Sequence, residues 1–373
     1  MIQNNPMMLH SSVSIEVKDL SVNLGGRKII DIPSLAVFQN EVLAIIGPNG
    51  SGKTTLLLAL AALLKPEKES SVIYWGRPVK YGSDIYKLRR QFAVLFQEPL
   101  LLSGNAWDNV TLGLRLRGVR KEEINLRAKK WMERFGIFGL AKQQVKTLSG
   151  GEAKRVSLAR AFVLQPEILF LDEPFTALDS PTRQALLEDF ESVLRETKIT
   201  TVMVTHDRNE ALVVAHRVAV LIGGRLRQLG RPDEVFNYPV DEEVAEFVEA
   251  GNILEGTIIE QNNGIAAVNI GKRQIEVVSH LPVNTRVIVC LRFEDITLSV
   301  HVVGEAFSSA RNRLKGVITR ALPFAAQVRI SIDCGLPLVA VITKRSYNEM
   351  ELAEGKEIIA TFKASSIHLI PHH

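Results

Sequence analysis

The segment GPNGSGKT at Gly47–Thr54 lies between the apolar run Val42–Ile46 and the helical stretch Lys53–Leu64. A strand that leads into a glycine-rich turn at the start of a helix is typical of a phosphate-binding loop. The turn directs backbone N–H groups at a β-phosphate, and the helix N-terminus favours negative charge. Lys53 is expected to contact the β- and γ-phosphates, and Thr54 to offer its hydroxyl to Mg²⁺. The nucleotide-binding residues predicted in this segment are Gly47, Pro48, Asn49, Gly50, Ser51, Gly52, Lys53, Thr54 and Thr55.

A second strand candidate ends in two carboxylates. The apolar run Ile168–Leu171 is followed by Asp172 and Glu173, and α/β sheets bind their ligands at the carboxyl ends of strands. We expect Asp172 to hold Mg²⁺ through its water shell and Glu173 to polarise the attacking water as general base. An acidic pair after a strand is a weak signal by itself, and its position after a phosphate loop strengthens it.

Strand-like and helix-like stretches alternate from about residue 13 to 240. The runs Thr200–Val204 and Val218–Ile222 are rich in β-branched residues, with helical stretches at Pro181–Arg195 and Arg208–Ala215 beside them. Gly223-Gly224 predicts a hairpin turn near the end of this region. The alternation predicts a largely parallel sheet covered on both faces. The fold class expected for residues 13–240 is therefore an α/β P-loop NTPase domain.

A further anion-binding segment is LSGGE at Leu148–Glu152. Ser149, Gly150 and Gly151 precede a helix predicted at Ala153–Leu164, and a serine with bare backbone at a helix start can hold an anion. Because the chain already has one phosphate site, a second one suggests that two chains share each nucleotide.

With these motifs in this order, residues Ser14–Phe236 resemble the ABC-transporter ATPase family. The resemblance implies ATP and Mg²⁺ as cofactors and a homodimer in which the signature Ser149–Gly151 binds the γ-phosphate held by the partner's phosphate loop. It also implies that Gln97 senses Mg²⁺ and faces a permease, together with the apolar stretch Pro99–Leu102. Ala177-Leu178-Asp179 matches the family's D-loop, and His206 matches its switch histidine. The catalytic residues expected are Glu173, His206 and Gln97; Asp172 and Asp179 join the cofactor-binding set, and Thr54, Gln97 and Asp172 are the Mg²⁺ residues.

Two positions depart from the family pattern. The signature ends in Glu152 where the family commonly has Gln. Upstream of the phosphate loop the family has an aromatic residue that stacks on adenine, and Leu24 occupies that position here. We hypothesise that Leu24 packs on the base as an apolar surface.

After about residue 245 the pattern changes to short alternating strands, such as Ala266-Val268-Ile270 and Val328-Ile330-Ile332. Turn signals at Asn263-Gly264, Gly271-Lys272 and Cys334-Gly335 separate them, which predicts a small all-β barrel tail over residues 241–373. The tail repeats itself at about 250–300 and 308–371, for example Asn252–Gly256 against Asn312–Gly316. Two barrels or one composite fold are both consistent with this repeat.

The tail resembles the transport-associated OB extension of importer ATPases through Leu291–Ile296, and its second repeat resembles molbindin-like domains. The segments that carry the second resemblance are Ser309–Gly316, Ala340–Ser346 and Phe362–Ser365. In that family such groups hold molybdate or tungstate, often between copies of the domain. The oxyanion residues implied here are Ser309, Arg311, Lys315, Thr343, Ser346, Lys363 and Ser365. The alternative is a dimerising barrel in which these residues bind nothing.

Charge, cysteine content and the length of apolar runs limit the partners and the compartment expected for this chain. A net charge of +4 with no long basic run argues against a nucleic-acid partner. Two cysteines without metal spacing fit a reducing compartment. The start lacks the apolar core of a signal peptide, and no apolar run is long enough to span a bilayer. We therefore expect a peripheral protein on the cytoplasmic face of the plasma (inner) membrane, docked on two integral-membrane permease subunits that work with an extracytoplasmic substrate-binding protein.

The function expected is ATP hydrolysis that energises import of molybdate or tungstate, with a tail that senses the intracellular oxyanion. Importers of sulfate, phosphate, iron, sugar or polyamine are the alternatives, because the ATPase subunit does not select the cargo. An ABC ATPase outside transport is less favoured, since no tandem unit or coiled-coil insertion is visible. A non-catalytic oxyanion store is disfavoured by the intact Lys53, Asp172 and Glu173.

Overall fold

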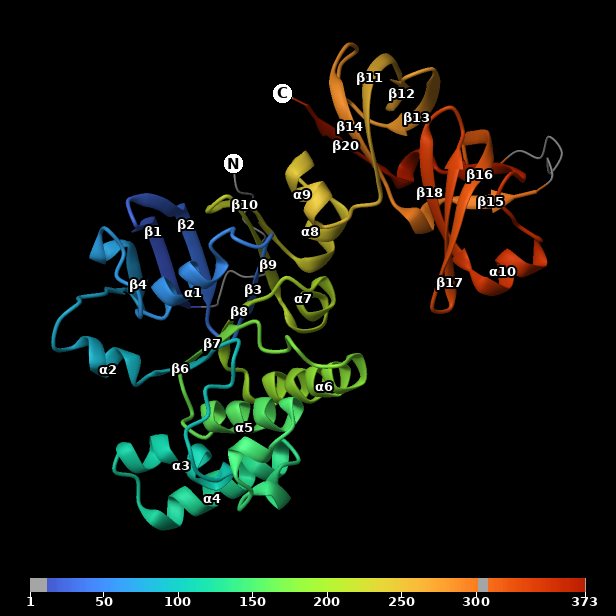
Figure 1. Ribbon diagram of the computed structural model, residues 1–373. Coiled ribbons are helices and arrows are strands. Elements are labelled where there is room, and N and C mark those ends of the chain that lie inside the picture. Colours follow the sequence, from blue (N-terminus) through green and yellow to red (C-terminus); the bar gives the residue numbers. More distant parts are fainter. Residues whose placement is uncertain (1–11, 301–307, 373) are drawn as a thin grey trace. The chain divides into compact units, whose positions relative to one another are not determined.

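The chain divides into two compact units between Pro232 and Asp233. The computed structural model describes residues 12–300 and 308–372 (Figure 1). The polar segment through Ser11, on which the signal-peptide argument rests, and His373 lie outside the described residues. Among the residues described, no helix combines the length and the apolarity needed to cross a membrane.

The division falls before the boundary expected between residues 240 and 241. Helices α8 (Pro232–Asn237) and α9 (Glu242–Phe247) flank a segment that packs on the end of the tail. The ring of His368 hydrogen-bonds the carbonyl of Pro239 at 2.9 Å and meets the ring of Tyr238 edge-on, which ties this segment to the second unit.

The central sheet of the first unit has six strands. In sheet order they are β10 (Arg225–Gly230), β9 (Arg217–Ile222), β3 (Val42–Ile46), β8 (Thr200–Val204), β7 (Ile168–Asp172) and β6 (Phe92–Leu95). All neighbours pair in parallel except β10, which runs antiparallel to β9 after the turn at Gly223-Gly224. The predicted parallel α/β sheet is confirmed, and β3 and β8 have the bounds predicted from their apolar runs.

A second, antiparallel sheet lies in the same unit. Its strands are β2 (Arg27–Phe38), β1 (Val13–Leu24), β4 (Val72–Tyr74) and β5 (Arg77–Pro78). Apolar side chains of this sheet, of the central sheet and of α1 (Lys53–Leu60) form one buried core. Helix α1 stops at Leu60 rather than at Leu64, because the Tyr74 hydroxyl and Arg89 take the carbonyls of Leu60 and Ala62, and Ala62 adopts a left-handed φ of 55°.

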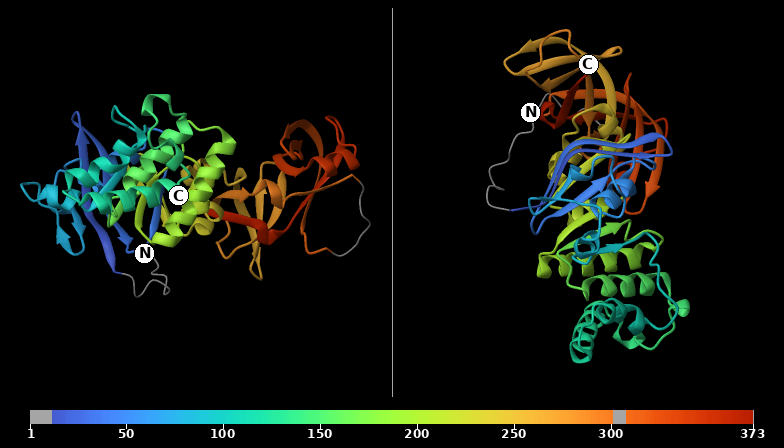
Figure 2. Two further views of the ribbon diagram at one scale, coloured as in Figure 1. Left: turned by 90° about the horizontal axis from the view of Figure 1, so that it is seen from below. Right: turned by 90° about the vertical axis from the view of Figure 1, so that its left-hand side faces the viewer.

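The remaining helices of this unit are α2 (Ile85–Arg89), α3 (Ala106–Leu116), α4 (Lys121–Arg134), α5 (Gly150–Phe162), α6 (Ser180–Thr197) and α7 (Arg208–Val214). Helices α3 to α6 gather on the side away from the antiparallel sheet (Figures 1 and 2). An aromatic cluster that includes Trp131, Phe162 and Phe190 joins α4, α5 and α6.

The second unit contains two five-stranded sheets that share one apolar core. The first has the order β13 (Arg273–Val278), β12 (Ile265–Ile270), β11 (Asn252–Asn262), β14 (Arg286–Leu291) and β20 (Ile367–Pro371). The second has the order β18 (Pro337–Thr343), β17 (Gln327–Asp333), β16 (Asn312–Phe324), β19 (Glu357–Phe362) and β15 (Thr297–Ser299). Helix α10 (Lys344–Glu349) follows β18.

The two repeats exchange their last strands. Strand β20, from the end of the second repeat, pairs with β14 of the first, and β15 of the first repeat pairs with β19 of the second; Figure 1 shows β20 beside β14. The sequence repeat is consistent with two barrels or with one composite fold, and the structure has one composite fold.

Candidate functional site

The phosphate loop is shaped by glycines at positions where a side chain cannot fit. A Cβ at Gly47 would collide with the backbone carbonyl of Leu221, and one at Gly52 would lie 2.7 Å from a methyl group of Ile30. Gly52 also has a φ of 96°, which L-residues rarely adopt. The loop is therefore held against β9 and β2 in the curled form that turns its N–H groups toward one point.

Lys53 reaches back across this loop. Its Nζ donates hydrogen bonds to the carbonyls of Gly47 at 2.9 Å and Pro48 at 3.0 Å. Burial lowers the pKa of Lys53, while the carboxylates of Glu173 and Asp172 act in the opposite direction. The ammonium group is thus already at the mouth of the loop, where a phosphate would replace carbonyl oxygens as its partners.

Thr54 and Asp172 meet at the carboxyl edge of the central sheet. The Thr54 hydroxyl donates to Oδ1 of Asp172 at 3.1 Å, and burial raises the pKa of that carboxyl. A hydroxyl beside a carboxylate supplies the hard oxygen ligands that Mg²⁺ prefers. Gln97 follows β6, the neighbour of β7, so it lies at the same edge.

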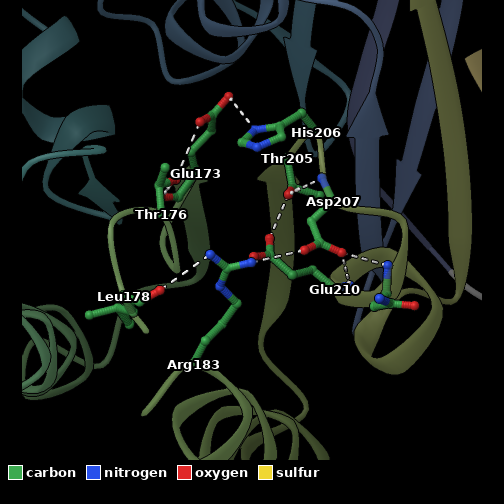
Figure 3. Close-up of polar contacts among 9 residues, drawn as sticks. Glu173, Thr176, Leu178, Arg183, Thr205, His206, Asp207 and Glu210 are labelled. Carbon is green, nitrogen blue, oxygen red and sulfur yellow. Dashed lines mark hydrogen bonds and ion pairs between the residues drawn. The ribbon is translucent and has the colours of Figure 1, made fainter. Parts of the chain in front are cut away.

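Glu173 and His206 form the second contact at this edge. Nδ1 of His206 lies 3.2 Å from Oε1 of Glu173 (Figure 3). The Glu173 backbone adopts a left-handed φ of 45°, a conformation that non-glycine residues hold mainly where the surroundings impose it. Its N–H donates to the carbonyl of Val204 at 2.9 Å, which ties the loop after β7 to the end of β8.

The signature segment and the D-loop lie together, at the starts of α5 and α6. Ser149 and Glu152 form a reciprocal capping box at the first turn of α5, so this helix begins at Gly150 and not at Ala153. A Cβ at Gly151 would lie 2.7 Å from Thr182, and Asp179 caps α6 by accepting from the Thr182 N–H at 3.0 Å. Ser149 and Gly150 remain exposed to solvent.

Leu24 is 45% exposed at the turn between β1 and β2. It pairs with Arg27 across Gly25-Gly26. The following part of β2 borders the phosphate loop, since Ile30 lies against Gly52. The Asp31 N–H also donates to the carbonyl of Gly224 at 2.9 Å, and the Gly224 N–H donates to the carbonyl of Ser51 in the loop. Leu24 thus lies at the end of a hairpin that is anchored beside the phosphate loop.

One buried cation in this region was not predicted. Lys154, on α5, is 4% exposed and donates to the backbone carbonyl of Gln97. Burial lowers its pKa, against the fields of Glu210, Glu173 and Asp172. The sequence signal that could have indicated its burial is its helical spacing, because Lys154 lies on the same face of α5 as Ser157 and Leu158, which are also buried.

The oxyanion candidates of the tail lie on different elements. Arg311 is 3.8 Å from Glu276 on β13, and Lys363 and Ser365 belong to the short helix Ala364–Ser366 and its cap, which packs on the same strand. Ser309 precedes Arg311 in the chain. Thr343 and Ser346 instead form the cap of α10, with their hydroxyls 2.8 Å apart. Lys315 lines a cavity of about 450 Å³ with Arg273, Asp333 and Glu357.

This arrangement at the carboxyl edge of the central sheet is that of an ATPase of the ABC type. The sequence matches the ABC transporter family over residues 30–176 and the TOBE domain over residues 308–369. The chain belongs to the ABC transporter family and is an ATP-hydrolysing subunit of an importer of that family, with a TOBE-containing tail.

Several relatives match almost over their full length. The molybdate/tungstate import ATP-binding protein WtpC of Pyrococcus horikoshii is 36% identical over 96% of this chain and 100% of its own length. The sulfate/thiosulfate import ATP-binding protein CysA of Thermosynechococcus vestitus is 29% identical over 93% and 95%. The solved structure of cbiO1 from Clostridium perfringens, part of the ABC transporter complex cbiONQ, has a TM-score of 0.57 at 30% identity and covers 64% of this chain and 95% of that one.

Proposed function

We propose that this chain is the Mg²⁺-dependent ATPase of a molybdate or tungstate importer and that it works as a homodimer. The observation that carries the ATPase part is the meeting of Thr54–Asp172 and Glu173–His206 at one edge of the sheet, beside the phosphate loop. Thr54, Asp172 and Gln97 would hold the metal, which supplies charge neutralisation at the β- and γ-phosphates.

Each remaining residue has a role that follows from its position. Lys53 exchanges its two carbonyl partners for phosphate oxygens. Glu173 accepts a hydrogen bond from the attacking water and orients it, and His206 holds the Glu173 carboxylate in place while it faces the γ-phosphate. The positive charge of the buried Lys154 offsets part of the negative charge of Asp172 and Glu173.

The dimer is supported by the exposed signature helix. Ser149 and Gly150 are exposed at the start of α5, where the Ser149 N–H and hydroxyl donate to the Glu152 carboxylate at 2.8 and 2.9 Å. A helix start that already holds a carboxylate has the donors that a phosphate group needs. A second copy would bring its bound ATP to this helix start. Sedimentation of a Glu173→Gln variant with and without Mg-ATP tests this, and a monomer under both conditions would contradict it.

We infer that the permease subunits contact the surface near Gln97. Leu100 and Leu102, in the loop that follows it, are 55% and 56% exposed, and an apolar pair beside the metal residue suits a partner that must respond to the nucleotide state. The chain would then lie on the cytoplasmic face of the plasma membrane, against two permease subunits. A substrate-binding protein would deliver the cargo to these subunits. Leu100→Glu should prevent co-purification with the permease subunits while leaving soluble ATPase activity unchanged.

The cargo and the sensing role rest on the tail and on the full-length match to a relative named for molybdate/tungstate import. A tetrahedral dianion requires positive charge, hydroxyls and N–H groups, and Arg311, Lys363 and Ser365 are gathered at β13. Sulfate is the competing cargo, because a relative named for sulfate/thiosulfate import also spans 93% of the chain. Calorimetry of the full chain with tungstate, molybdate and sulfate tests the sensor. Uptake of radiolabelled molybdate and sulfate by the assembled importer tests the cargo.

A further inference from the structure

Arg183 joins the two loops that carry the hydrolytic residues. It lies in the first turns of α6, and one terminal nitrogen donates to the Leu178 carbonyl at 3.3 Å while the other lies 3.3 Å from Oδ2 of Asp207 (Figure 3). Leu178 belongs to the D-loop after β7, and Asp207 follows His206 after β8. A single guanidinium group therefore spans from the D-loop to the loop of the switch histidine.

Asp207 is fixed to its own loop by several contacts. Its Oδ1 caps α7 by accepting from the N–H groups of Asn209 at 2.7 Å and Glu210 at 3.4 Å. Its own N–H donates to the Thr205 hydroxyl at 2.9 Å. Because His206 lies between Thr205 and Asp207, a shift of Asp207 has to move the His206 backbone as well.

Short contacts also connect Glu173 to the segment that leads to the D-loop. Thr176 donates to both the backbone carbonyl and the carboxylate of Glu173, at 2.8 and 3.2 Å. Glu173 contacts His206 at 3.2 Å. The contacts close a ring from Arg183 through Asp207 and His206 to Glu173 and back through Thr176 to Leu178.

We propose that Arg183 is a positioning residue for ATP hydrolysis: it sets the spacing between the loop of Glu173 and the loop of His206, and it transmits displacements of the D-loop to His206. Arginine suits this task because its planar fork can serve two acceptors at once, whereas lysine offers one point charge. Asp179 caps the same helix four residues earlier, so whatever displaces the D-loop also displaces the start of α6 and Arg183 with it.

The proposal predicts a kinetic pattern that a merely stabilising contact would not give. Arg183→Gln and Asp207→Asn should each lower kcat about ten- to hundredfold, because small misplacements of reacting groups carry penalties of this size. The KM for ATP should change less than twofold, since neither residue contacts the phosphate loop. The double variant should be no slower than the worse single variant, because both substitutions break the same link.

The experiment measures steady-state and single-turnover hydrolysis, binding of a fluorescent ATP analogue and thermal unfolding for wild type and these variants. Arg195→Gln is the matched control, since Arg195 lies on the same helix in an exposed pair with Glu191, and it should behave as wild type. The Asp207→Asn variant keeps an oxygen that can cap α7, so it provides the test if Arg183→Gln fails to fold. Wild-type turnover by the folded variants, additive losses in the double variant, or a loss of ATP affinity equal to the loss of kcat would each overturn the proposal.

Discussion

Asn252 and Asn312 make the same contact from opposite halves of the tail. The Asn252 amide accepts from the Val339 N–H at 2.6 Å and donates to the Val339 carbonyl at 2.9 Å. The Asn312 amide accepts from the Glu276 N–H at 2.7 Å and donates to the Glu276 carbonyl at 2.8 Å. Each asparagine begins the central strand of one repeat and hydrogen-bonds the backbone of an edge strand of the other. The repeated asparagine therefore helps to hold the two halves of the tail together.

The first prediction concerns these asparagine hydrogen bonds. Asn312→Ala should destabilise the tail by about 2 kcal/mol, because it leaves the N–H and the carbonyl of Glu276 without their partner at a part-buried position. The tail transition in a thermal unfolding scan should move down by several degrees, whereas ATP hydrolysis should remain. Asn269→Ala, at an exposed position of β12, serves as the control. An equal shift for both variants would contradict a specific stabilising role of the Asn312 hydrogen bonds.

How far the sequence predicted this fold depended on whether a signal was local. The bounds of β3 and β8 followed from apolar runs, and the Gly223-Gly224 and Asn263-Gly264 turns followed from turn chemistry. The strand exchange could not be predicted, because the repeat specifies two equal units but not which copy of the last strand each sheet takes. Helix α5 begins three residues before the start predicted at Ala153, because the Ser149–Glu152 capping box brings Gly150 and Gly151 into its first turn.

The same distinction applies to the site. Glu173, His206 and the phosphate loop each belong to a local motif and were predicted, although their mutual distances came only from the structure. Lys154 and Arg183 were missed because their partners lie on other elements, Gln97 on the β6 loop and Asp207 on the β8 loop. Neither residue carries a spacing signal that points to these partners.

The second prediction tests the general base. Glu173→Gln should lower kcat about 10²- to 10⁴-fold, the usual contribution of a positioned base. ATP affinity should persist, because Lys53 and the loop N–H groups that bind the phosphates are unchanged. Phosphate release and equilibrium ATP binding measured on the same preparation check both parts. A variant that hydrolyses ATP at the wild-type rate would assign the base to another residue.

The third prediction concerns pH. Burial raises the pKa of Glu210 from 4.5 to about 7, although its bond from the Thr205 hydroxyl acts in the opposite direction. Between these values the folded chain keeps a proton that the unfolded chain has lost. The free energy of unfolding should therefore fall as pH rises from about 4.5 to 7, by about 3 kcal/mol in all.

A Glu210→Gln variant isolates this effect. The charged or polar groups around Glu210 are Thr205, His206 and Asp207 at the end of β8, Arg183 on α6 and Lys154 on α5. Glutamine keeps an acceptor for Thr205 and cannot ionise, so the variant should be more stable than wild type at pH 8 and show a flatter stability profile between pH 5 and 8. Parallel profiles for the two proteins would show that Glu210 is ionised throughout.

The fourth prediction addresses base binding at Leu24. If Leu24 covers the base as an apolar surface, Leu24→Tyr should tighten ATP binding about fivefold, because stacking of an aromatic ring on a base contributes on the order of 1–3 kcal/mol. The preference for ATP over GTP should change as well. Leu126→Tyr, on the exposed face of α4, is a control that adds the same ring elsewhere. Unchanged affinity and unchanged base preference in Leu24→Tyr would place the base away from this hairpin.

The last prediction separates the two groups of oxyanion candidates. Arg311→Gln removes a charge from the group at β13, and Ser346→Ala removes a hydroxyl from the cap of α10. If the β13 group alone binds the anion, Arg311→Gln should weaken tungstate binding at least tenfold, about 1.4 kcal/mol, and Ser346→Ala should have no effect. If copies of the tail combine the two groups, both variants should weaken binding, and the heat of tungstate binding should depend on protein concentration. Arg345→Gln, an exposed arginine paired with Glu349 on the same helix as Ser346, controls for loss of surface charge. Tungstate binding that survives Arg311→Gln and Lys363→Gln together would show that the anion binds away from β13.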